Sequence, residues 1–106
     1  MKKFILVLTA VPEEKKGHEI AEKLLEERLA ACVTISSASQ SFYWWEGKIT
    51  KDQEYILFIK TKASAYDKLE ARLIELHPYN VPEIIALPIE RGSERYLGWL
   101  DEETKG

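Results

Sequence analysis

The predicted strands of this chain have apolar side chains on both of their faces, and this constrains the fold more than any other feature. Three short runs have this character: Ile5–Leu8, Tyr55–Ile59 and Ile84–Leu87. A strand that is covered on one face only alternates apolar and polar residues, because successive side chains point to opposite sides of the sheet. These runs do not alternate, so we expect both faces of the sheet to be covered.

The order of the predicted elements indicates one α+β domain over residues 1–106. Strands are predicted at 4–8, 31–35, 42–45, 48–50, 55–60 and 84–89, and helices at 13–31, from 64 to the residue before Pro78, and after Ser93. The compact arrangement of β-α-β-β-α-β is a ferredoxin-like sandwich, in which two helices cover one face of a four-stranded antiparallel sheet. An aromatic hairpin with Glu46-Gly47 at its tip and a short C-terminal helix are added to this arrangement.

Local signals predict how some of these elements begin and where they lie. Ser64 and Asp67 have the spacing of a capping box at the start of the second helix, with Asp in place of the usual Glu. Ser93 is predicted to cap the C-terminal helix. Pro88 lacks a backbone donor, so its strand is expected at an edge of the sheet.

The second apolar face of the sheet needs a cover that the two helices do not provide. Monomers rarely expose more than a few hundred Å² of contiguous apolar surface, and identical chains usually form closed symmetric oligomers. We therefore predict self-association, although this argument alone does not choose between two and three subunits. The hairpin residues Tyr43, Trp44 and Trp45 are a second candidate interface, because Tyr and Trp are favoured there. The alternative is that these rings pack inside their own subunit.

Composition excludes several classes of protein. A net charge of −3 without a basic stripe does not favour a nucleic-acid partner. No apolar run approaches the roughly 20 residues that span a membrane, and the apolar start is too short for a signal peptide. The single cysteine, Cys32, excludes an internal disulfide and is typical of a reducing compartment, so we expect a cytoplasmic protein.

Five blocks of sequence resemble one protein family in their order and spacing. They are Leu29–Val33, Tyr43–Lys48, Ile59–Lys62, His77–Ile84 and Tyr96–Leu100. Together they extend over nearly the whole chain and resemble the CutA family, the divalent-cation tolerance proteins. The resemblance implies a ferredoxin-like subunit and a homotrimer packed through its sheets, similar to the PII signalling proteins. It also implies a part in tolerance to copper and other divalent cations, with no established reaction.

His77 and Cys32 are the candidate metal ligands. Imidazole commonly binds copper and zinc, and a trimer could bring a carboxylate of another subunit, such as Glu54 or Glu83, beside His77. The alternative is that a His in the last turn of a helix complements the dipole or bonds a free carbonyl group. Cys32 is the only soft ligand, although a free Cys in a buried strand is often a small core residue.

Lys60 and Lys62 lie at the end of a predicted strand and are expected near Tyr79, where they could hold an anion between subunits. This suggests an alternative function, a PII-like sensor or assembly module that binds a small anionic ligand. The other interpretation is that both lysines are solvated charges that discourage edge-to-edge pairing. The sequence has no Ser-His-Asp order and no Gly-rich phosphate loop, so we do not expect an enzyme.

Overall fold

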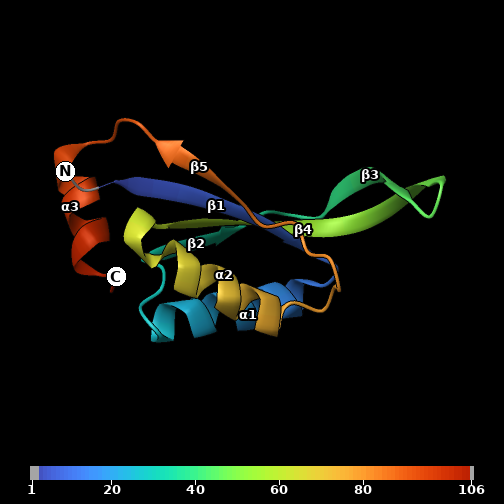
Figure 1. The fold of residues 1–106 in the computed structure, drawn as a ribbon, viewed down its shortest axis with the longest axis horizontal. Helices are drawn as coiled ribbons and strands as arrows, with labels where there is room; N and C mark the ends of the chain where they lie inside the picture. Colours follow the sequence, from blue (N-terminus) through green and yellow to red (C-terminus); the bar gives the residue numbers. More distant parts are fainter. Residues whose placement is uncertain (1–2, 106) are drawn as a thin grey trace.

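A computed structural model describes residues 3–105 and shows one antiparallel sheet with three α-helices (Figure 1). In chain order the elements are β1 (Phe4–Val11), α1 (Glu14–Glu26), β2 (Cys32–Ile35), β3 (Ser39–Trp45), β4 (Lys48–Lys62), a 3-10 turn (Ala63–Ala65), α2 (Tyr66–Leu76), β5 (Ile85–Ile89) and α3 (Glu94–Glu102). The strand order is β2-β4-β1-β5, and β3 pairs with the first half of β4. None of the helices between residues 3 and 105 is long and apolar enough to cross a membrane.

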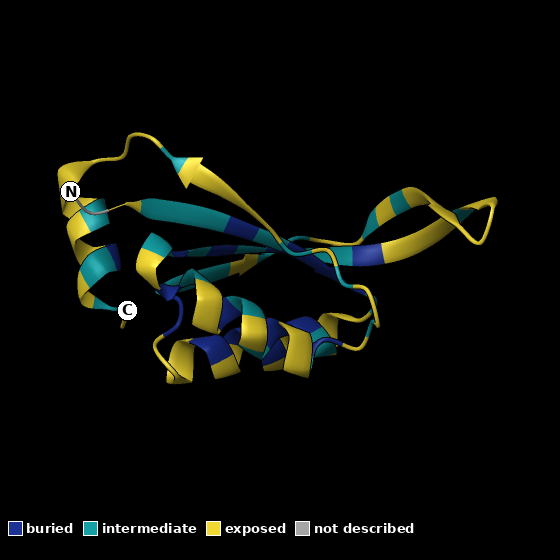
Figure 2. Cartoon of the chain, in the orientation of Figure 1, coloured by how far each residue is buried: buried dark blue, intermediate teal, exposed yellow. Residues whose placement is uncertain are grey.

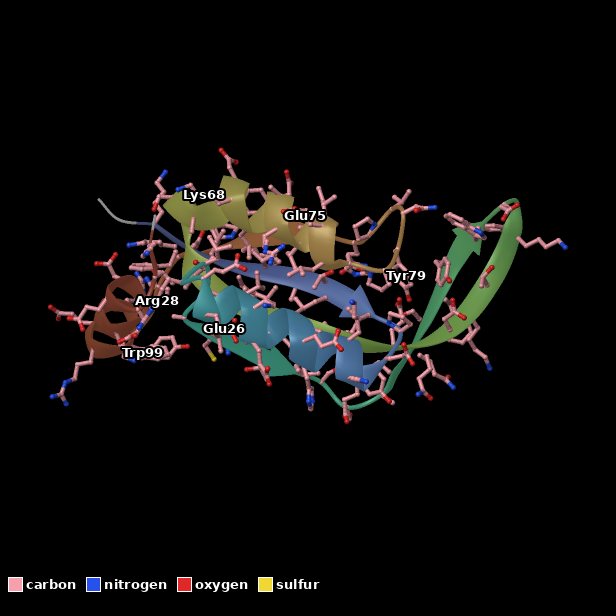
Figure 3. The ribbon with its side chains drawn as sticks, turned by 90° about the horizontal axis from the view of Figure 1, so that it is seen from below. Glu26, Arg28, Lys68, Glu75, Tyr79 and Trp99 are labelled. Atoms are coloured by element: carbon pink, nitrogen blue, oxygen red, sulfur yellow. The ribbon has the colours of Figure 1, made fainter. Side chains whose placement is uncertain are left out.

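Helices α1 and α2 lie side by side on one face of the sheet, and the core lies between them and the strands (Figures 1 and 3). Alternate strand residues point toward the helices, so Val7 stands opposite Ile59 and Thr9 opposite Leu57. Helices α1 and α2 contribute four fully buried aliphatic side chains to this core: Ile20, Leu24, Leu69 and Leu73. Burial of this apolar surface is the main favourable term in the stability of the subunit.

The opposite face of the sheet is a second apolar surface, which we call the open sheet face. It consists of Leu6, Leu8, Ile56, Phe58, Ile85 and Leu87. These residues alternate with the core residues along β1 and β4, and β5 is largely exposed (Figure 2). Helix α3 packs at the end of the sheet near the N-terminus, where Lys62 Nζ lies 3.2 Å from the carboxylate of Asp101 (Figure 1). The prediction that both faces of the sheet are apolar is therefore confirmed.

Strand β4 differs from its prediction because it is one continuous strand of 15 residues. The sequence indicated two strands, 48–50 and 55–60, separated by a polar segment. That segment remains extended because β3 pairs with it, from Phe42 opposite Lys51 to Ser39 opposite Glu54. The same pairing draws Ser39 and the residues after it into β3, where an irregular segment was expected.

Helix α1 ends at Glu26, five residues earlier than predicted. Arg28 adopts a left-handed backbone conformation with φ of 59°. The N–H of Leu29 then donates to the carbonyl of Leu24, and the N–H of Arg28 donates to that of Leu25. This is the Schellman termination, which usually has glycine in the left-handed position, so the sequence contained no glycine signal for it.

The predicted capping box of α2 is wrong, whereas the cap of α3 is confirmed. Residues Ala63–Ala65 form the 3-10 turn, and Ala65 occupies the cap position of α2 without a side-chain hydrogen bond. Ser93 accepts a hydrogen bond from the N–H of Tyr96 at 3.3 Å. Pro88 lies in β5, which within the described residues pairs only with β1, as expected of an edge strand.

Strand β3 and the first half of β4 form a hairpin that projects beyond the rest of the sheet (Figure 1). Glu46 and Gly47 at its tip both have positive φ, 49° and 76°. A type I′ turn requires this conformation, and its twist matches that of the strands. The aromatic rings of the hairpin are mostly exposed, which contradicts the alternative that they pack inside their own subunit.

Candidate functional site

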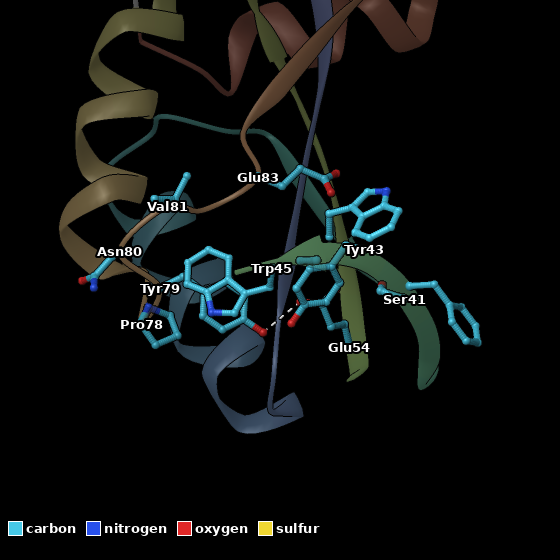
Figure 4. A pocket seen from close by; sticks show the side chains of 12 residues that line it. Ser41, Tyr43, Trp45, Glu54, Pro78, Tyr79, Asn80, Val81 and Glu83 are labelled. Atoms are coloured by element: carbon cyan, nitrogen blue, oxygen red, sulfur yellow. Dashed lines mark hydrogen bonds between the residues drawn. The ribbon is translucent and has the colours of Figure 1, made fainter. Parts of the chain in front are cut away.

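A cavity of about 720 Å³ lies between the hairpin and the segment that follows α2 (Figure 4). The hairpin contributes Ser41, Phe42, Tyr43, Trp44, Trp45 and Glu54, the segment contributes Pro78, Tyr79, Asn80, Val81 and Glu83, and Ala10 of β1 completes the lining. The lining therefore combines aromatic rings with two carboxylates and has no cationic side chain. We call it the hairpin cavity.

A buried carboxylate and a tyrosine hydroxyl meet in this cavity. Glu54 is 8% exposed, and it accepts a hydrogen bond of 2.8 Å from the hydroxyl of Tyr79 (Figure 4). Burial and the neighbouring Glu54 carboxylate raise the pKa of Tyr79 well above its usual value of 10. The hydroxyl is thus protonated at neutral pH and acts as the donor. On the hairpin, Tyr43 donates to Asp52 in the same way, and this hydrogen bond raises the pKa of Tyr43.

His77 lies behind the cavity and positions Tyr79. Its Nδ1 lies 3.1 Å from the backbone nitrogen of Tyr79, and its Nε2 lies 2.8 Å from the carbonyl oxygen of Ala10. Since the N–H of Tyr79 can only donate, Nδ1 accepts, and the proton is on Nε2, which donates to Ala10. Both nitrogens of the neutral ring are therefore used, and a metal on either would have to replace a hydrogen bond. Metal binding by His77 stays a prediction.

The neutral state of His77 should make the stability of the protein depend on pH. Burial lowers the pKa of His77 below its usual 6.5, although Ala10 and Glu54 oppose the shift. A lowered pKa means that the unfolded chain binds the proton more readily, so the free energy of unfolding should fall as the pH drops below about 6.5. Above about pH 7.5 the free energy of unfolding should be highest, and it should no longer depend on the protonation of His77.

Urea unfolding at several pH values between 7.5 and 5.5 would measure this dependence. The His77→Gln variant keeps an N–H donor for Ala10 but does not titrate, so its pH profile should be flatter than that of the wild type. Equal slopes for the two proteins would contradict the assignment of a neutral, hydrogen-bonded His77.

The other predicted ligands lie elsewhere in the sheet. Cys32 is half-buried on β2, where Lys60 Nζ is 3.7 Å from its Sγ and 3.1 Å from the hydroxyl of Thr34. Tyr79 contacts Glu54, which precedes Lys60 by six residues on the extended strand β4, about 20 Å away. The expectation that Lys60 and Lys62 lie near Tyr79 is therefore wrong within a single chain. Within residues 3–105, no three His, Cys, Asp or Glu side chains are grouped to hold a metal ion.

Comparison with known proteins identifies the family. The family model described as "CutA1 divalent ion tolerance protein" matches residues 5–103. The chain belongs to the CutA family. The divalent-cation tolerance protein CutA of Thermus thermophilus is 50% identical over 99 residues, which cover 93% of this CutA chain and 96% of that protein. The solved T. thermophilus structure has a TM-score of 0.93 at 48% identity and covers 99% of this chain and 100% of that one.

A plant relative is longer than this chain. The rice protein named "Protein CutA 1, chloroplastic" is 45% identical over 101 residues, which cover 95% of this CutA chain and 57% of the rice protein. The shared region thus corresponds to the domain described above, and the rest of the rice protein has no counterpart in this chain.

Most of the residues singled out from the sequence meet in the hairpin cavity of this CutA chain. They are Tyr43, Trp44, Trp45, Glu54, Tyr79 and Glu83. The remaining candidates, Cys32, Lys60 and Lys62, lie outside it, and His77 lies behind it. Sequence reasoning missed Asn80 and Val81, which line the cavity through the segment after Pro78. The only available signal was their position between Tyr79 and Glu83.

Proposed function

We propose that this chain forms a homotrimer of ferredoxin-like subunits that contributes to tolerance of divalent cations, copper among them, in the cytoplasm. The observation that carries the cation role is the CutA family match over residues 5–103, with relatives named divalent-cation tolerance proteins. No catalytic activity is part of this proposal.

The open sheet face supports the trimer. Both long helices cover the other face, so six aliphatic and aromatic side chains remain for a partner. A copy of the same chain offers the same apolar surface, and a closed ring of copies leaves none of it exposed. Without β3 and the C-terminal helix α3, the element order is the β-α-β-β-α-β of a ferredoxin-like subunit. Three such sheets would pack around an axis in the manner of the PII proteins.

The donors of one chain do not form a complete metal site. Both nitrogens of His77 are hydrogen-bonded, and the thiol of Cys32 has the Lys60 ammonium as its neighbour. A cation would repel that ammonium, and a lone Cys or His supplies too few ligands. In the proposed function, therefore, donors from more than one subunit hold the cation.

Calorimetric titration with Cu(II) tests the cation role. We expect saturable binding by the wild-type protein and an affinity about tenfold lower in His77→Ala, because losing a ligand or its support has effects of this size. Cys32→Ser tests the second candidate ligand. The matched control is His18→Ala, which removes an exposed histidine of α1 and should bind as the wild type does.

The same titrations show whether His77, Cys32 or neither of them binds the cation. Equal binding by wild type, His77→Ala and Cys32→Ser would exclude both candidate ligands. No saturable binding by the wild type to copper, zinc or cobalt would contradict the cation role itself.

A PII-like sensor of small anions is the second candidate function. Lys60 lies on the same side of the sheet as the open sheet face. Its ammonium group has Cys32 and Thr34 as polar neighbours, and within residues 3–105 no carboxylate pairs with it. In a trimer this ammonium would lie between subunits. A thermal-shift screen with nucleotides and inorganic phosphate tests this anion-binding function. An unchanged melting temperature with every anion would count against the sensor function.

A further inference from the structure

Helix α3 has negative charges at the end where a helix favours positive ones. Asp101 and Glu102 are its last two residues, Glu103 follows in the cap position, and the last turn has no basic residue. Carboxylates at a helix C-terminus are unfavourable, because the helix dipole leaves partial negative charge there. A helix of nine residues is also too short to be stable by itself in water. The sequence of α3 alone therefore does not explain why it is helical.

Two cations from distant parts of the chain supply the missing positive charge. Lys62 Nζ, at the end of β4, donates to the carboxylate of Asp101 at 3.2 Å and to its carbonyl oxygen at 3.4 Å. Arg28, which lies beside α3 (Figure 3), donates from Nη1 to the carboxylate of Glu103 at 2.5 Å and to its carbonyl oxygen at 3.4 Å. The last carbonyl groups of a helix have no partner within the helix, so these cations satisfy free acceptors and also oppose the negative charge. The helical state of α3 thus depends on Arg28 and Lys62.

The apolar anchoring of α3 is small by comparison. Among the residues of α3, all of which the structure describes, only Leu100 is buried. Tyr96 and Trp99 pack against each other with their ring centres 5.6 Å apart, and each remains 41% exposed. After the helix, the N–H of Lys105 donates to the carbonyl of Arg28 at 2.8 Å. Segments with few buried contacts open locally before the whole protein unfolds, so α3 is a candidate for such opening.

We propose that α3 and residues 103–105 form a C-terminal strap that opens and closes as one unit at the end of the sheet, held closed by the charges of Arg28 and Lys62. The strap gives a reason for arginine in the left-handed conformation after α1, where φ is 59° and glycine would be unstrained. The side chain of Arg28 is an attachment point that glycine would lack. Ionic strength therefore controls whether this end of the subunit is ordered. The strap does not depend on the divalent-cation role proposed above.

Hydrogen exchange of the full-length protein, measured amide by amide with NMR, tests the proposal. The amides of Leu100, Glu103 and Lys105 should share one opening reaction and exchange faster than the amides of β1 and β4. Between about 0.1 M and about 1 M NaCl the screening length falls from about 10 Å to about 3 Å, so their exchange should become about threefold faster. The amides of β1 and β4 should not accelerate. Exchange in α3 that is as slow as in β4, as a covering copy of the chain would cause, or that does not respond to salt, would overturn the proposal.

Two isosteric variants at neighbouring positions separate the ion pair from the charge of the helix end. Glu103→Gln removes the charge that pairs with Arg28, and it should accelerate exchange of the Leu100 amide about two- to fivefold, since the pair is half-exposed. Glu102→Gln is the matched control, because Glu102 has no ion-pair partner within residues 3–105 and its loss relieves the helix dipole. It should leave the exchange unchanged or slow it. Equal acceleration in both variants would exclude Arg28 as the attachment point.

The Arg28→Gly variant separates opening of the strap from stability of the subunit. It removes the same ion pair but also relieves the left-handed backbone conformation. We therefore expect faster exchange in α3, while the urea midpoint of the whole protein does not fall. A lower midpoint with equal acceleration of every amide would mean that α3 opens only when the whole subunit unfolds, and this would overturn the proposal.

Discussion

Replacing Leu87 by glutamate is expected to convert the proposed trimer into monomers. Leu87 stands opposite Leu6 on the open sheet face and is 43% exposed in the isolated chain. Packing against another copy would bury the new carboxylate without a partner, which costs several kcal/mol, and the symmetry repeats this cost in every subunit. Light scattering should change from about three times 12.3 kDa to about 12.3 kDa.

A control on the opposite side of the subunit makes the result specific. Ile74 of α2 is 55% exposed and lies on a helix that covers the other sheet face. Ile74→Glu introduces the same charge with a similar loss of apolar surface, and it should leave the trimer intact. A trimeric Leu87→Glu variant, or a wild type that is already monomeric, would contradict the assembly proposed from the open sheet face.

Truncating Leu57 to alanine is expected to cause the largest loss of subunit stability. Leu57 is fully buried in β4, and its Cδ1 would lie 3.3 Å from a Cβ placed on Gly17 of α1. The helix thus approaches the strand closely at this point, and the surroundings have little freedom to close the space left by the deleted atoms. We expect the free energy of unfolding to fall by about 3 kcal/mol, within the range of roughly 2–5 for such changes.

Urea unfolding at one fixed chain concentration measures this loss, because association also contributes to the stability of an oligomer. Ile49→Ala is the control on the same strand, where the side chain is 68% exposed near the hairpin tip. Its effect should stay within about 0.5 kcal/mol. Similar losses for the two variants would mean that the core does not lie where the register of β1 and β4 puts it.

The candidate site was predictable in its composition but not in its arrangement. Aromatic and acidic residues stood out in the hairpin and after α2, and six of them meet in one cavity. Lys60 and Lys62 were expected beside Tyr79 because the predicted topology placed the end of their strand near the segment that follows the second helix. The register of the continuous strand β4 separates them instead, since each residue along an extended strand adds about 3.3 Å.

The sequence by itself determined that this protein has a sheet with two apolar faces and helices for only one of them. The two apolar faces can be recognised from the sequence of each strand alone, because successive side chains point to opposite faces whichever strand lies beside it. Only the tertiary structure decided that α1 ends at a left-handed Arg28, that β3 holds β4 in one piece, and that His77 is neutral. His77 bonds the carbonyl of Ala10, 67 residues earlier in the chain. Such a partner is brought into contact only by the packed fold, so no local pattern around His77 could have indicated it.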